Sequence, residues 1–361
     1  MKKKFLVLML VFAMIFTLAA CSGSTESEEP AEEPAAEQTG EVPEDDEIVW
    51  AQGNSGNVLV SIAKQQGYFD ELGLNVTEIP LDDGQLEAVL TGQVDIASNS
   101  GTWGPLQRIA AGDDMCIIGG HMLTGCMPVI AKEGTEFNGP EDFLGKKLGE
   151  TKSRYALFHT LVEQGHDLDK EIEFVSFDND SDKIAAVQKG EIDFATIGTG
   201  RMYEVLNTEG VEIVTYLSDQ TPNYSCCRMV ARDSWAQENP TTIKLLDQAL
   251  IRAMAYFEAH REDCVDLMTE QLGATKEYVE AYMLNEHYRI NPDPVRNIVM
   301  DNFEYMKSVG GIENLDENLN LDDRIYTDLY KQALDAAVAA YHDEAPEFYD
   351  NAVKFFEENN Q

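Results

Sequence analysis

The sequence predicts an α/β protein with two similar lobes that hold one small ligand between them. One pattern, A-V-x-x-G-[polar]-[V/I]-D-[I/F]-A-[S/T], occurs at residues 88–98 and again at residues 186–196. Each copy reads as a helix end, a glycine that stops the helix in the left-handed conformation, and a short strand buried on both faces. A polar loop containing glycine follows each copy. Two strands that end in such loops indicate one site shared by two lobes.

The first twenty residues have the features of a targeting segment. A basic stretch at residues 2–4 precedes an apolar run at residues 5–20. This run is short for a transmembrane helix, and the sequence L-A-A-C that ends at Cys21 resembles a bacterial lipobox. We therefore predict a lipoprotein signal peptide over residues 1–20 and a lipid on Cys21. The alternative is an ordinary secretory signal followed by an incidental cysteine.

Residues 21–47 are expected to form an acidic, disordered tether. They are rich in Glu, Pro, Ala and Ser and contain no Lys or Arg, so they cannot bury a core. The whole chain has 66 Asp and Glu against 26 Lys and Arg, a net charge of −40. This charge argues against a nucleic-acid partner, which requires a basic surface, and against a protein that spreads over anionic lipid.

Strands and helices alternate from residue 48, which is typical of parallel sheets. We predict a crossing strand at residues 127–131 that leads into the second lobe, and a return crossing at residues 223–230. Lobe I should therefore contain residues 48–128 and 226–361, and lobe II residues 129–225. In lobe I we expect strands at 48–52, 74–79 and 115–119 and helices at 57–66, 85–91 and 105–111.

Lobe II and the C-terminal region follow in order. In lobe II we expect strands at 172–177 and 211–217 and helices at 155–164, 182–189 and 201–207. From Pro240 the composition becomes helical, and residues 243–259 keep an apolar stripe at three- and four-residue spacing. Further helices are expected at 261–272, 275–286, 295–308, 322–342 and 346–358. These C-terminal helices should pack on lobe I and complete its core.

Several phrases of the chain resemble the nitrate, taurine and aliphatic-sulfonate class of solute-binding proteins of ABC importers. They are G-Y-F-x-x-x-G-L-x-V at residues 67–76, G-x-V-D-I-A at 92–97, L-G-K-K-L-G at 144–149 and G-x-I-D-F-A at 190–195. A long helix after Pro240 also fits, so the resemblance covers about residues 48–290. The superfamily also contains binders of pyrimidine-type vitamin precursors and enzymes that make the thiamine pyrimidine.

The resemblance implies a two-lobed, type II periplasmic-binding-protein-like fold with a C-terminal helical extension. It implies an extracytoplasmic protein that closes around its solute by a hinge and delivers it to permease and ATPase subunits. The pyrimidine-synthesising enzymes carry a cluster of several cysteines, whereas only Cys226 and Cys227 are adjacent here. The sequence also lacks H-E-x-x-H, G-x-S-x-G and P-loop motifs. We therefore predict a protein that is not an enzyme and has no cofactor and no metal site. The alternatives are a binder of a pyrimidine-type precursor or an aromatic compound, an enzyme related to the pyrimidine-precursor synthases, and a sensor subunit that presents its ligand to a membrane receptor.

The ligand-binding residues are expected in loops beyond the carboxyl ends of the strands, where helix N-termini present free N–H groups. Their hydroxyl, amide and backbone donors, together with two arginines, suit an anion such as a sulfonate, carboxylate or nitrate. Helix capping is the alternative role for each polar residue, and a surface ion pair is the alternative for each arginine. The candidates are Asn54, Ser55, Asn99, Ser100, Thr102, Trp103, Ser153, Arg154, Tyr155, Gly198, Thr199, Arg201 and Tyr224.

The repeated aspartates and the cysteines are interpreted as structural. Asp95 and Asp193 occupy the same position in the two copies of the repeat, where a carboxylate can hold the corner between helix and strand. Five cysteines remain after Cys21, and their odd number is not that of a disulfide framework. Buried free thiols are the main interpretation, and a bond from Cys126 to Cys226 or Cys227 is the alternative. The other two cysteines are Cys116 and Cys264.

Overall fold

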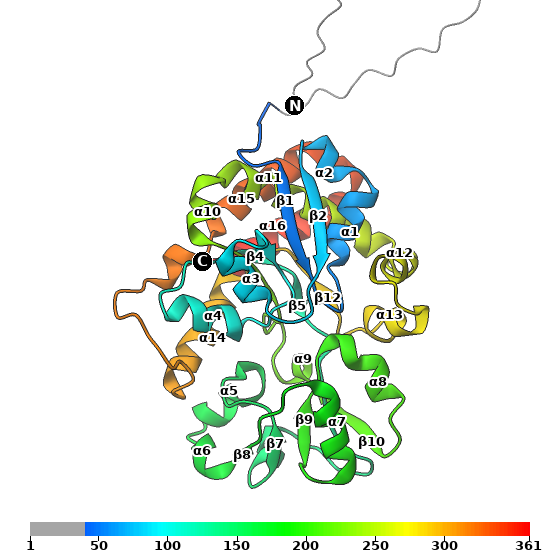
Figure 1. Cartoon of the computed structure of the whole chain (residues 1–361), viewed down its shortest axis with the longest axis vertical. Coiled ribbons are helices and arrows are strands. Elements are labelled where there is room, and N and C mark those ends of the chain that lie inside the picture. Colours follow the sequence, from blue (N-terminus) through cyan, green and yellow to red (C-terminus); the bar gives the residue numbers. More distant parts are fainter. Residues whose placement is uncertain (1–39) are drawn as a thin grey trace, which may run out of the picture. The chain divides into compact units, whose positions relative to one another are not determined.

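Two sheets form the centres of the two lobes in the computed structural model, which describes residues 40–361 (Figure 1). The predicted signal peptide, Cys21 and the tether up to residue 39 lie outside the described residues. The first sheet has the order β2 (Asn75–Pro80), β1 (Glu47–Gln52), β3 (Ile96–Ala97), β11 (Arg228–Ala231), β4 (Cys116–Gly120). The second has the order β10 (Val211–Tyr216), β6 (Pro128–Lys132), β9 (Phe194–Thr196), β7 (Lys147–Gly149), β8 (Glu173–Phe174). We call the parts built on these sheets the first and second lobes.

The two sheets have matching topologies. In each, four strands run parallel and one strand, β11 or β6, runs antiparallel to its neighbours. Each antiparallel strand follows a segment that crosses from the other lobe. A chain that arrives at the carboxyl edge of a parallel sheet must run back through it, which explains the reversed direction. The fold is the expected type II periplasmic-binding-protein-like architecture.

Helices cover both sheets, and the longest of them organises the first lobe. This helix, α11 (Pro240–Ala259), packs against α1 (Val58–Gln65) and α15 (Thr327–Tyr341) and buries Leu246, Leu250 and Phe257. The second lobe carries α5 (Tyr155–Glu163), α7 (Asp180–Lys189) and α8 (Met202–Leu206). The first lobe and the C-terminal region also contain α2 (Tyr68–Glu71), α3 (Gln85–Thr91), α4 (Trp103–Ala110), α10 (Asp233–Glu238), α12 (Asp263–Leu272), α13 (Lys276–Met283), α14 (Arg296–Ser308) and α16 (Pro346–Asn359).

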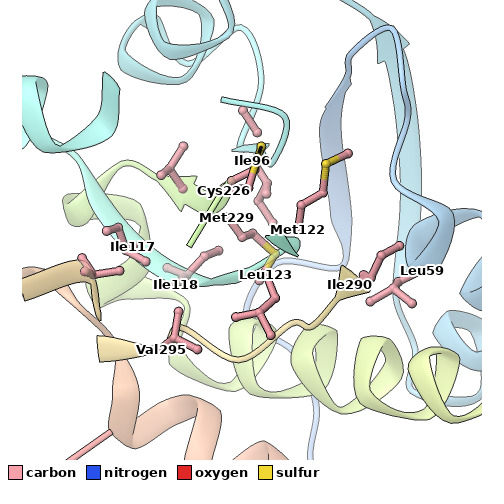
Figure 2. Close-up of a cluster of buried hydrophobic side chains, with 14 of the residues drawn as sticks. Leu59, Ile96, Ile117, Ile118, Met122, Leu123, Cys226, Met229, Ile290 and Val295 are labelled. Atoms are coloured by element: carbon pink, nitrogen blue, oxygen red, sulfur yellow. Dashed lines mark hydrogen bonds between the residues drawn. The ribbon is translucent and has the colours of Figure 1, made fainter. Parts of the chain in front are cut away.

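The core of the first lobe joins segments that are far apart in the sequence. Figure 2 shows Ile117 and Ile118 of β4 near Leu123 and Val295. Leu123 belongs to β5 (Met122–Thr124), which pairs with β12 (Arg289–Ile290) in a two-stranded sheet that the sequence did not predict. Both strands are too short to produce a recognisable alternation. Within residues 40–361 every helix is too short or too polar to cross a bilayer.

The two copies of the repeat serve as matching scaffold. Gly92 and Gly190 end their helices with φ of 72° and 73°, which a side chain would disfavour. Asp95 Oδ2 accepts the N–H of Val49 at the start of β1, and its own N–H bonds to the same residue. Asp193 makes the equivalent pair with Lys147 in β7. The predicted structural role of both aspartates is confirmed, since each ties its strand to the neighbouring parallel strand.

The last residues of the expected tether differ from the disordered segment we predicted. Glu44 accepts hydrogen bonds from the backbone N–H groups of Thr241 and Thr242 in the first turn of α11. Asp45 accepts a hydrogen bond from Trp235 Nε1 at 3.2 Å, and Lys244 pairs with Glu41 at 2.6 Å. Unpaired N–H groups at a helix N-terminus attract carboxylates, so this part of the acidic segment docks on α11.

One predicted strand is shorter in the structure. We expected a strand over residues 172–177, but β8 contains only Glu173 and Phe174. Beyond the strand, Asn179 caps α7, with its Oδ1 accepting the N–H of Asp182 at 2.9 Å. The turn carries residues 178–180 toward the edge where the loops of the two lobes meet.

We expect Asp95→Ala to lower the free energy of unfolding by about 1–3 kcal/mol, because the part-buried N–H of Val49 would lose its acceptor. Asp193→Ala should lower the free energy of unfolding less, since Asp193 is exposed and water can replace its carboxylate as the hydrogen-bond acceptor. Urea unfolding of both variants measures the difference. Asp95→Asn, which keeps an acceptor oxygen, is the control and should retain most of the stability. Equal losses at the two positions would contradict the assigned roles.

The Glu44 cap predicts a pH-dependent contribution to stability. Burial opposes ionisation of Glu44, but the hydrogen bonds from Thr241 and Thr242 outweigh it and lower its pKa below the usual 4.5. Because the folded pKa is the lower one, the contribution is present above pH 4.5 and is lost as the pH falls below it. Glu44→Ala should cost about 0.5–1 kcal/mol at pH 7, after allowance for solvent screening. Melting curves of the variant and the unchanged protein should therefore differ more at pH 7 than at pH 3. A loss of stability in Glu44→Ala that is the same at both pH values would exclude a charged cap.

Candidate ligand-binding cleft

A cleft of about 420 Å³ is lined by residues of both lobes and of both crossing segments. Its walls are the loops that follow β1, β2 and β3 in the first lobe and β7, β8 and β9 in the second lobe. This is the carboxyl edge of both sheets, where open α/β folds bind their ligands. Eight of the predicted site residues line it: Asn54, Ser55, Asn99, Trp103, Arg154, Gly198, Thr199 and Arg201.

Asn99 joins the two loops of the first lobe. Its Nδ2 donates to Ser55 Oγ at 3.1 Å and to the Gly56 carbonyl at 2.9 Å. Asn57, rather than Ser55, caps α1 by accepting the N–H of Leu59. Asn54 is exposed at the cleft, and so is Trp103, which is 41% exposed. Trp50 and Trp235 are buried.

Three of the remaining candidates hold the crossing segments or border the cleft. The Thr102 hydroxyl is buried and donates to the carbonyl of Ser225. Tyr224 is also buried, and its hydroxyl accepts the N–H of Gly125 at 3.0 Å. Ser100 lines an adjoining hollow with Gly53 and does not line the cleft. The hydroxyl groups of Thr102 and Tyr224 are hydrogen-bonded to backbone groups, so both residues have a structural role in this geometry.

Ser153 and Tyr155 also lie away from the cleft. Ser153 is buried, and its N–H is 3.3 Å from Thr151 Oγ1. Tyr155 stacks on His159 with ring centroids 4.5 Å apart and meets Tyr305 edge to face. Tyr155 therefore packs against the C-terminal helix α14, to which Tyr305 belongs.

The groups of the second lobe that we expected to bind an anion already have partners. Arg154 Nη2 donates to Glu150 Oε1 at 3.2 Å, and Arg154 Nε lies 3.1 Å from Glu150 Oε2. The N–H of Gly198, at the start of the polar loop after β9, is bound by Asp180 Oδ2 at 2.7 Å. Arg201 is 47% exposed and lies 3.7 Å from Glu204. The expected anion donors are thus largely neutralised within the protein.

The structure adds carboxylates that the sequence interpretation missed. Asp82 and Asp83 follow β2, while Asp178 and Asp180 follow β8, and all four line the cleft with Asn179. Against these four acids stand Arg201 and Arg154, of which Arg154 is paired with Glu150, while Asp180 is paired with Lys183 at 3.0 Å. The sequence could have revealed these carboxylates, because each pair lies just after a predicted strand. The same criterion identified the other loops of the site. The cleft is therefore acidic.

Sulfur atoms form the rest of the lining, through Met122, Met127, Cys226 and Cys227. All five cysteines of the described chain are free and buried, which confirms the interpretation as buried thiols. A hydrogen bond with Cys227 lowers the pKa of Cys226 to about 7, against the opposing effect of burial. Within residues 40–361, no group of three or more His, Cys, Asp or Glu side chains is arranged to hold a metal ion.

The fold and the cleft define a protein with the architecture of type II periplasmic binding proteins. The NMT1/THI5-like family matches residues 54–264, and the chain belongs to this family. No curated protein matches the chain.

Solved structures support the same fold. The periplasmic aliphatic sulphonate binding protein SsuA from Escherichia coli has a TM-score of 0.62 and 18% identity, covering 78% of this chain and 92% of its own. The periplasmic nitrate-binding protein NrtA from Synechocystis PCC 6803 has a TM-score of 0.64 and 14% identity, with coverages of 82% and 90%. The desulfurization enzyme DSZB has a TM-score of 0.58 and 14% identity, with coverages of 81% and 99%. The fold is thus shared by binding proteins and by an enzyme.

We expect Asp180→Ala to increase the response to oxyanions, because it frees the Gly198 N–H and the ammonium group of Lys183 and removes a negative charge. Sulfate should raise the melting temperature of this variant more than that of the unchanged protein. Asp182→Ala, in the first turn of the same helix but outside the cleft, controls for the general stabilising effect of sulfate. If both variants respond equally, Asp180 does not block an anion site.

Proposed function

We propose that the protein is an extracytoplasmic solute-binding protein of an ABC importer, anchored by a lipid on Cys21. It captures a small solute between its lobes and delivers it to permease and ATPase subunits. The observation that carries this proposal is a cleft lined by loops from the carboxyl edges of both sheets. A solute that contacts both lobes favours the closed arrangement and shifts the equilibrium toward it.

Two of the structural relatives support a binding role. SsuA and NrtA are described as binding an aliphatic sulphonate and nitrate, respectively. DSZB shows that the same fold also occurs in an enzyme, so the fold alone does not distinguish binding from catalysis. The lining of the cleft contains no histidine. We therefore propose that the chain binds its solute without converting it.

The charges of the cleft refine the solute class. We expected an anion, but Asp82, Asp83 and Asp178 are exposed at the cleft, while Arg154 is paired. Among the anionic solutes considered, a zwitterion of the taurine type fits best. Its ammonium group has carboxylates as partners, and its sulfonate has Arg201.

An aminopyrimidine is the second candidate. Its flat ring would stack on the exposed Trp103, and its N–H groups would donate to the carboxylates. This candidate corresponds to the binders of pyrimidine-type precursors in the same superfamily.

A thermal-shift comparison tests the solute class. Taurine should stabilise the protein more than ethanesulfonate, which has the same sulfonate but no ammonium group. At a concentration of 100 times Kd the expected stabilisation is about 2.7 kcal/mol. The double variant Asp82→Asn/Asp83→Asn should lose the preference, and Trp103→Phe should remove the accompanying change in tryptophan fluorescence.

Three outcomes are decisive in that comparison. Equal stabilisation by ethanesulfonate or nitrate would exclude the zwitterion. A response to an aminopyrimidine but not to taurine would select the second candidate. If no small solute stabilises the protein, the proposed function is contradicted.

A further inference from the structure

Four sulfur-containing side chains line the cleft and come from the two crossing segments. Cys226 Sγ lies 3.5 Å from Cys227 Sγ and 3.6 Å from Met127 Sδ. Met122 is the neighbour of Cys227, whose N–H donates to the Met122 carbonyl at 3.1 Å. Figure 2 shows Met122 and Cys226 in the same buried cluster. All four residues line the cleft, so a solute can reach them.

The spacing of the sulfur atoms resembles that of a metal site. Metal–sulfur bonds of about 2.3 Å in tetrahedral geometry place the ligand atoms about 3.8 Å apart. The two measured separations, 3.5 and 3.6 Å, are close to this value. Cys226 Sγ therefore lies at a suitable distance from each of the other two sulfur atoms, and a shared metal ion would also require Cys227 Sγ and Met127 Sδ to take such a separation.

The backbone around these atoms is built to hold them there. Asn223 and Ser225 have positive φ angles of 57° and 61°, which non-glycine residues rarely adopt. The Ser225 carbonyl is fixed by the Thr102 hydroxyl. Opposite, a side chain on Gly125 would place its Cβ 2.8 Å from Cys226 Sγ. Strain of this kind persists where the surrounding structure enforces it and is concentrated at functional sites.

The chemistry of the lining selects among metals. Thiolate sulfur binds both Cu(I) and Zn²⁺, whereas thioether sulfur is a soft ligand that favours Cu(I), and Mg²⁺ or Ca²⁺ sites use oxygen. The lining of the cleft contains two thiols and two thioethers but no histidine. The carboxylates that surround the cleft also favour the approach of a cation.

We propose that Cys226, Cys227 and Met127, with Met122 beside them, bind one thiophilic monovalent metal ion of the Cu(I) class. Binding replaces the thiol protons, which pass to the solvent, and the metal keeps its oxidation state. Met127 directly precedes β6, and Cys227 directly precedes β11, so the ion joins the two crossing segments. The proposal goes beyond the proposed function and does not depend on the identity of the solute.

Anaerobic titration of the full chain with Cu(I), in competition with a chromophoric Cu(I) chelator, tests the site. We expect one Cu(I) per chain that survives the competition. Cys226→Ser should abolish this binding, and Met127→Leu should weaken it by about tenfold or more. Met127→Leu conserves volume, so it should fold even if Cys226→Ser does not. Cys264→Ser removes a buried free thiol on α12, outside the cleft, and should bind Cu(I) like the unchanged protein.

The proposal is overturned if the unchanged protein yields all its Cu(I) to the chelator. It is equally overturned if Met127→Leu binds as tightly as Cys264→Ser, because the sulfur contacts would then be packing only. Zn²⁺ retained at the same residues with similar strength would exclude the monovalent class. The taurine comparison in the presence of a metal chelator is independent, so failure of one proposal is distinguishable from failure of the other.

Discussion

The hydrogen bonds that join the two crossing segments set the geometry on which the rest of the cleft depends. The N–H groups of Cys226 and Cys227 donate to the carbonyls of Leu123 and Met122, both at 3.1 Å. A third contact runs from the N–H of Thr102 to the carbonyl of Cys226 at 2.9 Å. These bonds lie in a buried region, where unpaired backbone groups are costly. They therefore fix the two crossings together and place the loops of both lobes around one space.

The repetition of the scaffold explains why the fold could be predicted from the sequence. Gly92 and Gly190 must adopt a conformation that favours glycine, and Asp95 and Asp193 must reach the neighbouring strand. Such local requirements leave a pattern that repeats in both lobes. The pairing of β5 with β12 left no such pattern in the sequence. The two strands are short and about 165 residues apart, so they carry no periodic signal.

The candidate site could be predicted only in part. The rule that polar loops follow strands placed Asn54, Asn99 and Gly198 at the cleft. It did not show which groups were already bound, because the partners are remote: Thr102 meets Ser225, and Gly198 meets Asp180. The same rule applied to residues 82–83 and 178–180 would have found the acids. We weighed hydroxyls and arginines more heavily than carboxylates, and this choice produced the expectation of an anion.

The contact between Asp180 and Gly198 has a further consequence for selectivity. The carboxylate is part of the chain, so its effective concentration at the Gly198 N–H is high, commonly in the millimolar range or above for tethered groups. It works as an intramolecular competitor. Dilute inorganic anions would have to displace it before they could occupy this position. Only a solute with additional contacts in both lobes would gain enough from binding to do so.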